Sequence, residues 1–308
     1  MRLGTGVAVP GLRSAPDTAN AIATINQLAP GRVFLGLGTG NTAMRTLGRK
    51  PMRLKPFAEY IQLVRALLNG EDAAYAEAGE SHHIRFQNAS RGVYNIGHEI
   101  PIHIGGFGPK AQALAGQLGD GLITGLPRGG TVEQALSNVR RGAAAAGRNL
   151  DEFYTSALVN LVLLEPSESL SSEGVVARCG SAIMANIHYL VDQFEDNGKL
   201  PPDSVMPIWD DYMAFHESRD ESRRHQKLHA SHYTYLDADE AKFVTPEIIK
   251  AFCIAGSPDE IIEQLQVLEV AGLDGISFMP PDDERHAMYE AFAKNVIERM
   301  RGPRGRQT

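Results

Sequence analysis

Short apolar runs alternate with amphipathic helical patterns along most of the chain. The helical pattern is clearest after Pro56, where apolar residues recur every three or four positions until Gly70 ends the segment. The runs between the helices are almost wholly apolar, which predicts strands buried on both faces in a parallel sheet. The expected strands are 2–9, 33–38, 101–105, 120–124, 155–164 and 275–279.

This alternation predicts an α/β fold with right-handed crossovers in one domain over residues 1–308. Two architectures fit, a doubly wound open sheet and a (β/α) barrel, and six expected strands fall short of the eight in a complete barrel. Residues 71–100 are polar and turn-rich, which indicates an excursion from this rhythm. Residues 171–252 interrupt it again. They are helical in parts and rich in His and Arg, and we interpret them as a helical insertion.

Composition narrows the classes of function. The 308 residues include 30 basic and 37 acidic side chains, and the basic ones are scattered, which argues against a nucleic-acid surface. We find no apolar run long enough for a membrane span and no signal-peptide pattern. Cys179 and Cys253 are too few for a disulfide framework or a cysteine zinc site, as expected in a reducing cytoplasm. We therefore expect a cytoplasmic protein that binds neither nucleic acid nor membranes.

A first glycine-rich turn, Gly-Leu-Gly-Thr-Gly-Asn at 36–41, follows the second expected strand. From Gly38 to Ala43 it matches G-x-G-x-x-A, the fingerprint of dinucleotide-binding turns. Such a turn leads directly into a helix, whereas helical periodicity here begins only at residue 56, so an NAD-dependent enzyme would require a helix from Asn41. We predict a loop whose backbone amides approach an anion, with a ligand-free turn as the alternative.

A second glycine-rich turn, Gly-Gly-Phe-Gly at 105–108, leads into a helix that begins at Pro109. Glycines let a ligand approach the backbone closely, and the first turn of a helix offers N–H groups and a positive dipole end. Together the two turns predict phosphate binding. The alternative is an ordinary strand-to-helix turn without a ligand.

Three histidines, His225, His229 and His232, lie close together in the insertion. The first two are one helical turn apart, but no carboxylate stands at ligand spacing, so we predict a solvated or pocket-rim face and no metal. The chain has no G-x-S-x-G motif, and neither cysteine has the context of a nucleophile. The missing acid, base and metal favour a reaction whose chemistry a cofactor performs.

In their order along the chain, several motifs resemble those of the luciferase-like flavin/F420-dependent oxidoreductases, the bacterial luciferase-like monooxygenase superfamily. The similarity is greatest to the members that resemble methylenetetrahydromethanopterin reductase. It extends over the whole chain and is weakest across 171–240. The motifs that carry it are Leu3–Val7, Gly31–Gly40, Pro101–Lys110, Leu118–Gly121 and Gly256–Glu260.

The resemblance implies a TIM-type (β/α)8 barrel that binds FMN or coenzyme F420 at the carboxyl ends of its strands. It implies a non-prolyl cis peptide at Gly6–Val7, behind the cofactor ring. The cofactor-binding positions that it implies are Gly6 and Val7 at the ring, Thr39, Gly40 and Asn41 beside the tail, and Gly106, Phe107 and Gly108 at the phosphate.

The activity implied is hydride transfer between the cofactor and a small organic substrate or, with FMN and O2, transfer of an oxygen atom. The insertion would cover the substrate side, which makes His229 and His232 the catalytic candidates. We expect a homo-oligomer. The alternative is a non-catalytic flavin-binding or partner subunit with an incomplete barrel.

Family members begin with two βα units before the strand that opens this chain. The resemblance therefore implies a barrel truncated at its N-terminus to about six strands, with the insertion before the last helix–strand unit. Leu3–Val9 and Gly275–Met279 would then be unpaired apolar edges, which invite pairing with another chain. We expect either that the true start lies upstream of Met1 or that another subunit covers the gap.

Overall fold

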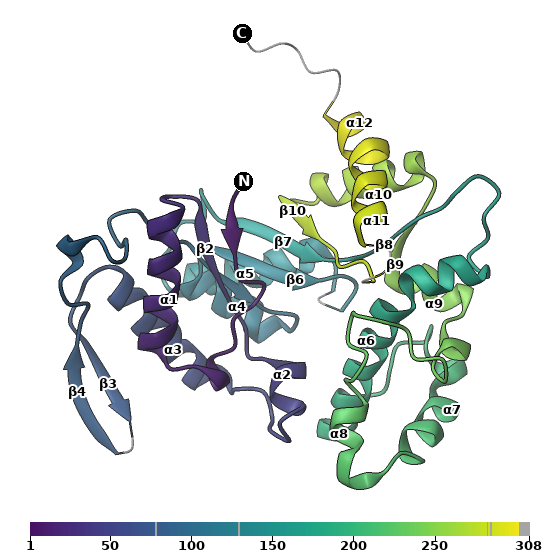
Figure 1. Cartoon of the computed structure of the whole chain (residues 1–308), viewed down its shortest axis with the longest axis horizontal. Coiled ribbons are helices and arrows are strands. Elements are labelled where there is room, and N and C mark those ends of the chain that lie inside the picture. The colour runs from purple at the N-terminus through teal and green to yellow at the C-terminus, as the bar shows by residue number, and fades with distance from the viewer. Residues whose placement is uncertain (78, 129, 282, 284, 302–308) are drawn as a thin grey trace. The chain divides into compact units, whose positions relative to one another are not determined.

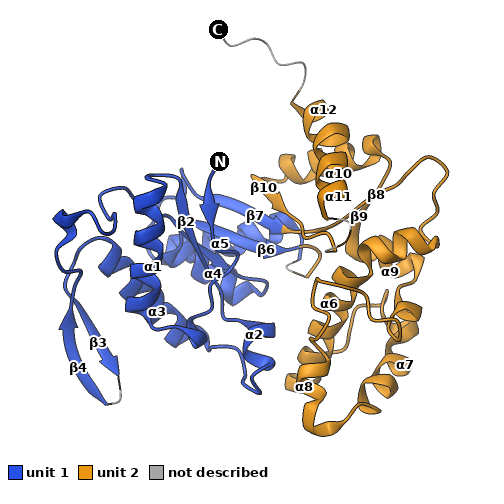
Figure 2. Ribbon diagram, in the orientation of Figure 1, with its two compact units in different colours: residues 1–125, 129–157 blue, residues 126–128, 158–308 orange. Residues whose placement is uncertain are grey.

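The computed structural model describes residues 1–77, 79–128, 130–281, 283 and 285–301. The chain divides into two compact units (Figure 2): unit 1 contains residues 1–125 and 129–157, and unit 2 contains residues 126–128 and 158–308. The single domain and its insertion, expected from the sequence, stay predictions. Among the described residues, no helix has the length and apolar character to cross a membrane.

The strands of unit 1 follow one another in the sheet in chain order. Parallel pairs join β1 to β2, β2 to β5 and β5 to β6, as predicted. Burial on both faces does not hold for β1, because both of its residues are exposed. A doubly wound sheet reverses its strand order at a switch point, and this order has no reversal, so the open-sheet alternative is wrong. The neighbouring strands are β1 (Leu3–Gly4), β2 (Val33–Leu37), β5 (Ile102–Gly105), β6 (Gly121–Gly125) and β7 (Tyr154–Leu158).

One hydrophobic core joins these strands to the helices of unit 1. Alternate residues of a strand point to the same face, and Val33, Leu35 and Leu37 of β2 all belong to this core. Phe57 and Ile61, which are fully buried, meet them from the helical side. The helices that contribute to the core are α1 (Ala15–Leu28), α3 (Leu54–Leu68), α4 (Pro109–Leu118) and α5 (Val132–Ala145).

A short helix and a hairpin of unit 1 were not predicted. A helix, α2 (Asn41–Arg45), directly follows Gly40, so the expectation that helical periodicity begins only at residue 56 is wrong. Five residues are too few to show a period of 3.6 in the sequence. Within the polar segment 71–100, β3 (Ala73–Glu77) and β4 (Glu80–Ile84) form an antiparallel hairpin, which extends away from the rest of unit 1 in Figure 1.

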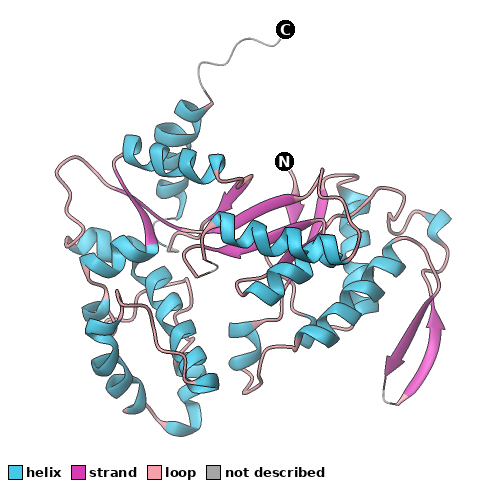
Figure 3. Cartoon of the chain, turned by 180° about the vertical axis from the view of Figure 1, so that it is seen from behind, coloured by secondary structure: helices cyan, strands magenta, loops and turns pink. Residues whose placement is uncertain are grey.

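Unit 2 contains a parallel pair of strands, β8 (Asn160–Leu163) and β9 (Cys253–Gly256), and the short strand β10 (Gly275–Ser277). The expected strand 155–164 is therefore two strands, β7 of unit 1 and β8 of unit 2. Between β8 and β9 the chain is mainly helical (Figure 3), and its core includes Trp209. The helices of this segment are α6 (Glu173–Asn197), α7 (Met206–Glu217), α8 (Arg224–Lys227) and α9 (Pro246–Phe252).

The last helices of unit 2 pack around a separate small core that includes Leu161 of β8 and Phe292. The first of them starts at a capping box: the Ser257 hydroxyl accepts from the Glu260 backbone N–H, and the Glu260 carboxylate accepts from the Ser257 N–H. A π-helical turn at Ala293–Ile297 lies between the last two of these helices. These helices are α10 (Pro258–Val270), α11 (Arg285–Phe292) and α12 (Glu298–Met300).

Candidate functional site

The three predicted cofactor-binding turns lie together in unit 1, after β1, β2 and β5. These strands are parallel neighbours, so their carboxyl ends meet at one edge of the sheet. Val7 lies at the centre of this arrangement. A Cβ atom added to Gly38 would be 2.5 Å from Val7 Cγ2, and one added to Gly105 would be 3.3 Å from Val7 Cγ1.

The peptide bond between Gly6 and Val7 is cis, as the resemblance predicted. Hydrogen bonds fasten both sides of this bond to the same residue of β2. The Thr5 hydroxyl donates to the Gly36 carbonyl oxygen at 2.7 Å, and the Ala8 N–H donates to that oxygen at 2.8 Å. The segment that carries Gly6 and Val7 is therefore fixed against the sheet.

The turn at Thr39, Gly40 and Asn41 is stabilised by its own backbone conformation and by hydrogen bonds to neighbouring residues. Gly40 has a φ of 81°, in the left-handed region that favours glycine. The Met52 N–H donates to the Thr39 carbonyl oxygen at 3.1 Å, and the Asn41 side-chain oxygen accepts from Arg45 Nε at 2.9 Å. A helix does start at Asn41, as an NAD-dependent enzyme would require, but it has five residues and the strand order excludes the doubly wound sheet of such enzymes.

The third turn, Gly106 to Gly108, leads into α4. The Gly106 N–H donates to the Ile123 carbonyl oxygen at 3.0 Å, and Gln112 Nε2 donates to the Phe107 carbonyl oxygen at 3.3 Å. Gly108 is the N-cap of α4 and contributes no side chain to the cap. The first N–H groups of an α-helix have no partner within the helix, so this end suits an anion.

Gly6 and Gly108 differ from the other glycines of these turns. A Cβ atom at either position would meet no atom within 4 Å, and neither residue has a φ in the left-handed region. The fold therefore does not require glycine at these two positions. A bare backbone beside open space is what a closely approaching ligand requires, and the residues present thus fit a bound cofactor.

The two catalytic candidates, His229 and His232, belong to unit 2. Their ring centroids are 6.2 Å apart, and the ring of His188 on α6 lies 6.1 Å from that of His229. His229 is 4% exposed, and its Nε2 lies 3.4 Å from Asp192 Oδ2. The expectation of a solvated or pocket-rim face is therefore wrong for His229, because the residue packs beside α6.

A buried carboxylate, Glu240, joins several distant residues of unit 2 and was not predicted. It accepts hydrogen bonds from His188 Nε2 at 3.0 Å, from the Tyr212 hydroxyl at 2.9 Å and from Arg219 at 2.6 Å. Burial alone would raise the pKa of Glu240, but His188 and Arg219 lower this pKa to about 2. The donors lie 21 to 52 residues from Glu240, so no sequence motif marks the network.

We expect acid to destabilise unit 2 through His232. Burial, followed by electrostatic interactions with His229, His188 and Arg128, lowers the pKa of His232 to about 3 against the opposing effect of Asp192. The unfolded chain binds this proton near pH 6.5, so stability is lost as the pH falls from about 6.5 to about 3. Urea unfolding, monitored by Trp209 fluorescence, measures this loss as a shift of the unfolding midpoint with pH. The His232→Gln variant should show a smaller shift of the midpoint over this pH range. An unchanged slope would contradict the assignment.

The model of the luciferase-like monooxygenase family matches residues 1–275, and the chain belongs to this family. It is 29% identical to the 5,10-methylenetetrahydromethanopterin reductase of Archaeoglobus fulgidus, covering 98% of this chain and 83% of that protein. It is 26% identical to an F420-dependent glucose-6-phosphate dehydrogenase of Mycolicibacterium fortuitum, covering 97% and 79%.

Solved structures share the fold at low sequence identity. An F420-dependent secondary alcohol dehydrogenase in complex with an F420-acetone adduct has a TM-score of 0.61 at 16% identity, covering 96% of this chain and 79% of that chain. The oxygenating constituent of 3,6-diketocamphane monooxygenase from Pseudomonas putida, in complex with FMN, has a TM-score of 0.57 at 15% identity, covering 96% and 79%. These names contain the two cofactors predicted from the sequence, F420 and FMN.

Proposed function

We propose that this chain is an oxidoreductase that transfers a hydride between coenzyme F420 or FMN and a small organic substrate. The observation that carries the proposal is the pair of glycines at 6 and 108, which face open space although the fold does not require glycine there. The family and the cofactors in the names of its relatives support the same function.

The residues of unit 1 would bind and orient the cofactor. The turn at Gly106, Phe107 and Gly108 would place its phosphate at the first amides of α4, although the Gly106 N–H itself is bonded to the Ile123 carbonyl oxygen. Gly6 and Val7 would support its ring, and the turn at 39–41 would contact its tail. When bound, the flavin or deazaflavin ring supplies the hydride chemistry, and the protein supplies position and exclusion of water.

His229 and His232 stay the catalytic candidates of this proposal. The pKa of His232, lowered to about 3, keeps its imidazole neutral near pH 7. A neutral imidazole with so low a pKa is a weak base, so we propose that His232 orients the substrate by hydrogen bonding. The second ring lies beside the buried carboxylate of Asp192, whose Oδ2 is 3.4 Å from His229 Nε2.

A cofactor-binding screen tests the proposed function. We expect fluorescence titration to show tight binding of F420 or FMN and no binding of NADH or NADPH, because the site presents amides without a doubly wound sheet. If the chain binds neither FMN nor F420, the proposal is wrong and the non-catalytic partner subunit is favoured. Tight NADH binding would contradict it in favour of a nicotinamide enzyme.

A further inference from the structure

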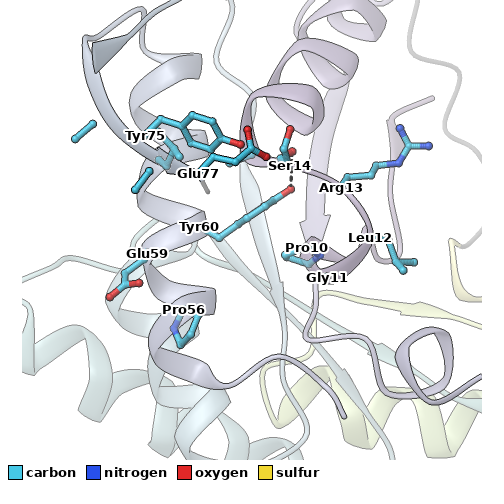
Figure 4. A pocket seen from close by; sticks show the side chains of 14 residues that line it. Pro10, Gly11, Leu12, Arg13, Ser14, Pro56, Glu59, Tyr60, Tyr75 and Glu77 are labelled. Atoms are coloured by element: carbon cyan, nitrogen blue, oxygen red, sulfur yellow. Dashed lines mark hydrogen bonds between the residues drawn. The ribbon is translucent and has the colours of Figure 1, made fainter. Parts of the chain in front are cut away.

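A cavity of about 630 Å³ lies in unit 1 between β3, α3 and residues 10–15 (Figure 4). The protein itself uses the hydroxyl groups in its walls. The Tyr60 hydroxyl donates to the Ser14 carbonyl oxygen at 3.2 Å, and the Tyr75 side chain hydrogen-bonds to Ser14. The charges in the walls are exposed and of both signs, so they do not select one class of ligand. These charges are Arg13, Glu59 and Glu77.

Unit 2 contains a more specific juxtaposition, which is a contact between the two cysteines of the chain. Cys179 and Cys253 are the only cysteines among the 308 residues and are far apart in the sequence. Their thiols nevertheless hydrogen-bond to each other, and both are free. A buried residue contacts about 6–12 others, so two given residues of a chain of this length meet by chance in only a few per cent of cases. The contact therefore indicates a pair that acts together.

The fold directs both thiols into the same core. Cys179 lies on α6 and is 2% exposed. On β9, Cys253 and Ala255 pack against this core, whereas Ile254 packs against the separate core of the last helices. Successive side chains of a strand point to opposite faces, so β9 holds the Cys253 thiol towards α6. Joining two sulfur atoms that are already in contact requires no large movement of the backbone.

The reduced pair is protected while unit 2 is closed. The hydrogen bond with Cys179, together with burial, raises the pKa of Cys253 well above its ordinary value. Thiol–disulfide exchange requires a thiolate and access to it. Exchange at this pair therefore depends on local opening of unit 2, which separates α6 from β9 and admits an oxidant.

We propose that Cys179 and Cys253 form a reversible disulfide when unit 2 opens in the presence of a disulfide oxidant such as oxidised glutathione. One protein thiolate attacks the glutathione disulfide, whose S–S bond breaks and releases one glutathione. The second protein thiolate attacks the resulting mixed disulfide and releases the other glutathione. The two protein thiols are oxidised, the glutathione disulfide is reduced to two thiols, and the two protons pass to those thiols.

The disulfide closes residues 179–253 into a covalent loop and fastens α6 to β9. A cross-link that closes a long loop stabilises a protein mainly by restricting the unfolded chain. Oxidation therefore makes unit 2 more resistant to heat, and reduction reverses the effect. In reducing compartments such disulfides are transient and redox-sensing. The inference concerns unit 2 alone, so its test does not depend on cofactor binding.

Refolding the full chain from urea in a glutathione redox buffer tests the pair. Free thiols are alkylated at equilibrium, and the intact mass is measured with and without prior reduction. With oxidised glutathione in excess, we expect a monomer with one internal disulfide. Its Tm should exceed that of the reduced chain by roughly 5–10 °C. Any other thiol state at equilibrium, or an oxidised chain whose Tm is equal or lower, would overturn the proposal.

A variant that moves one thiol by a single residue along β9 is the matched control. Cys253→Ala combined with Ile254→Cys keeps two cysteines but directs the second one to the opposite face of the strand. It should acquire glutathione without an internal disulfide. Cys253→Ala alone should have the same Tm in oxidising and reducing buffers. If the double variant forms the internal disulfide as completely as the unchanged chain, or if Cys253→Ala gains the same Tm on oxidation, the proposal is wrong.

Discussion

Gly108→Val is expected to weaken binding of F420 or FMN by roughly 10- to 100-fold, the loss of one or two hydrogen bonds to a charged group. The valine side chain would occupy the open space through which a phosphate reaches the first amides of α4. Gly108 has φ −97° and ψ 157°, an extended conformation that valine adopts readily, so the fold should persist. Fluorescence titration measures the affinity, and circular dichroism checks the fold.

Gly97→Val is the matched control for this experiment. Gly97 is exposed, lies outside the three turns, and a Cβ atom there would meet nothing closer than 3.6 Å. The control should bind the cofactor with unchanged affinity. If the Gly108→Val variant and the unchanged protein bind the cofactor with equal affinity, the phosphate does not bind at the start of α4. The proposed site then loses its main support.

Elements with local signals could be predicted from the sequence. Ser257 and Glu260 stand three residues apart before an apolar run, and the structure contains both of their capping hydrogen bonds. Gly108 and Pro109 marked the start of α4 in the same way. The glycine-rich turns at 36–41 and 105–108 could be located because each follows a buried strand, whereas Gly6–Val7 and its cis bond came from the resemblance alone.

Features that depend on distant partners could not be predicted. Ala73–Glu77 contains three alanines and a glutamate, which do not favour a strand, and it becomes one by pairing with residues 80–84. The apolar run 155–164 does not show that Val159 separates two strands of different sheets. Strand order, which decided against the doubly wound sheet, leaves no periodic signal in the sequence.

Glu240→Ala is expected to lower the free energy of unfolding of unit 2 by roughly 3–5 kcal/mol, the usual effect of breaking a buried ion pair. The side chain of Glu240 is 2% exposed and that of Arg219 is 13% exposed, so the change leaves a guanidinium charge largely buried without its carboxylate. His188 and Tyr212 lose the same acceptor. Urea unfolding followed by the fluorescence of Trp209, the chain's one tryptophan, reports on this core.

Glu195→Ala is the control variant, because it also removes a Glu–His hydrogen bond but not a buried carboxylate. Glu195 accepts from His216 Nε2 at 3.1 Å, close to the 3.0 Å between His188 and Glu240, but its side chain is 47% exposed. Water can replace an exposed partner, so this variant should lose no more than about 1 kcal/mol. Glu240→Gln, which keeps an acceptor but not the charge, should fall between the two. If Glu240→Ala and Glu195→Ala lower the free energy of unfolding equally, Glu240 is not needed to stabilise the buried charge of Arg219.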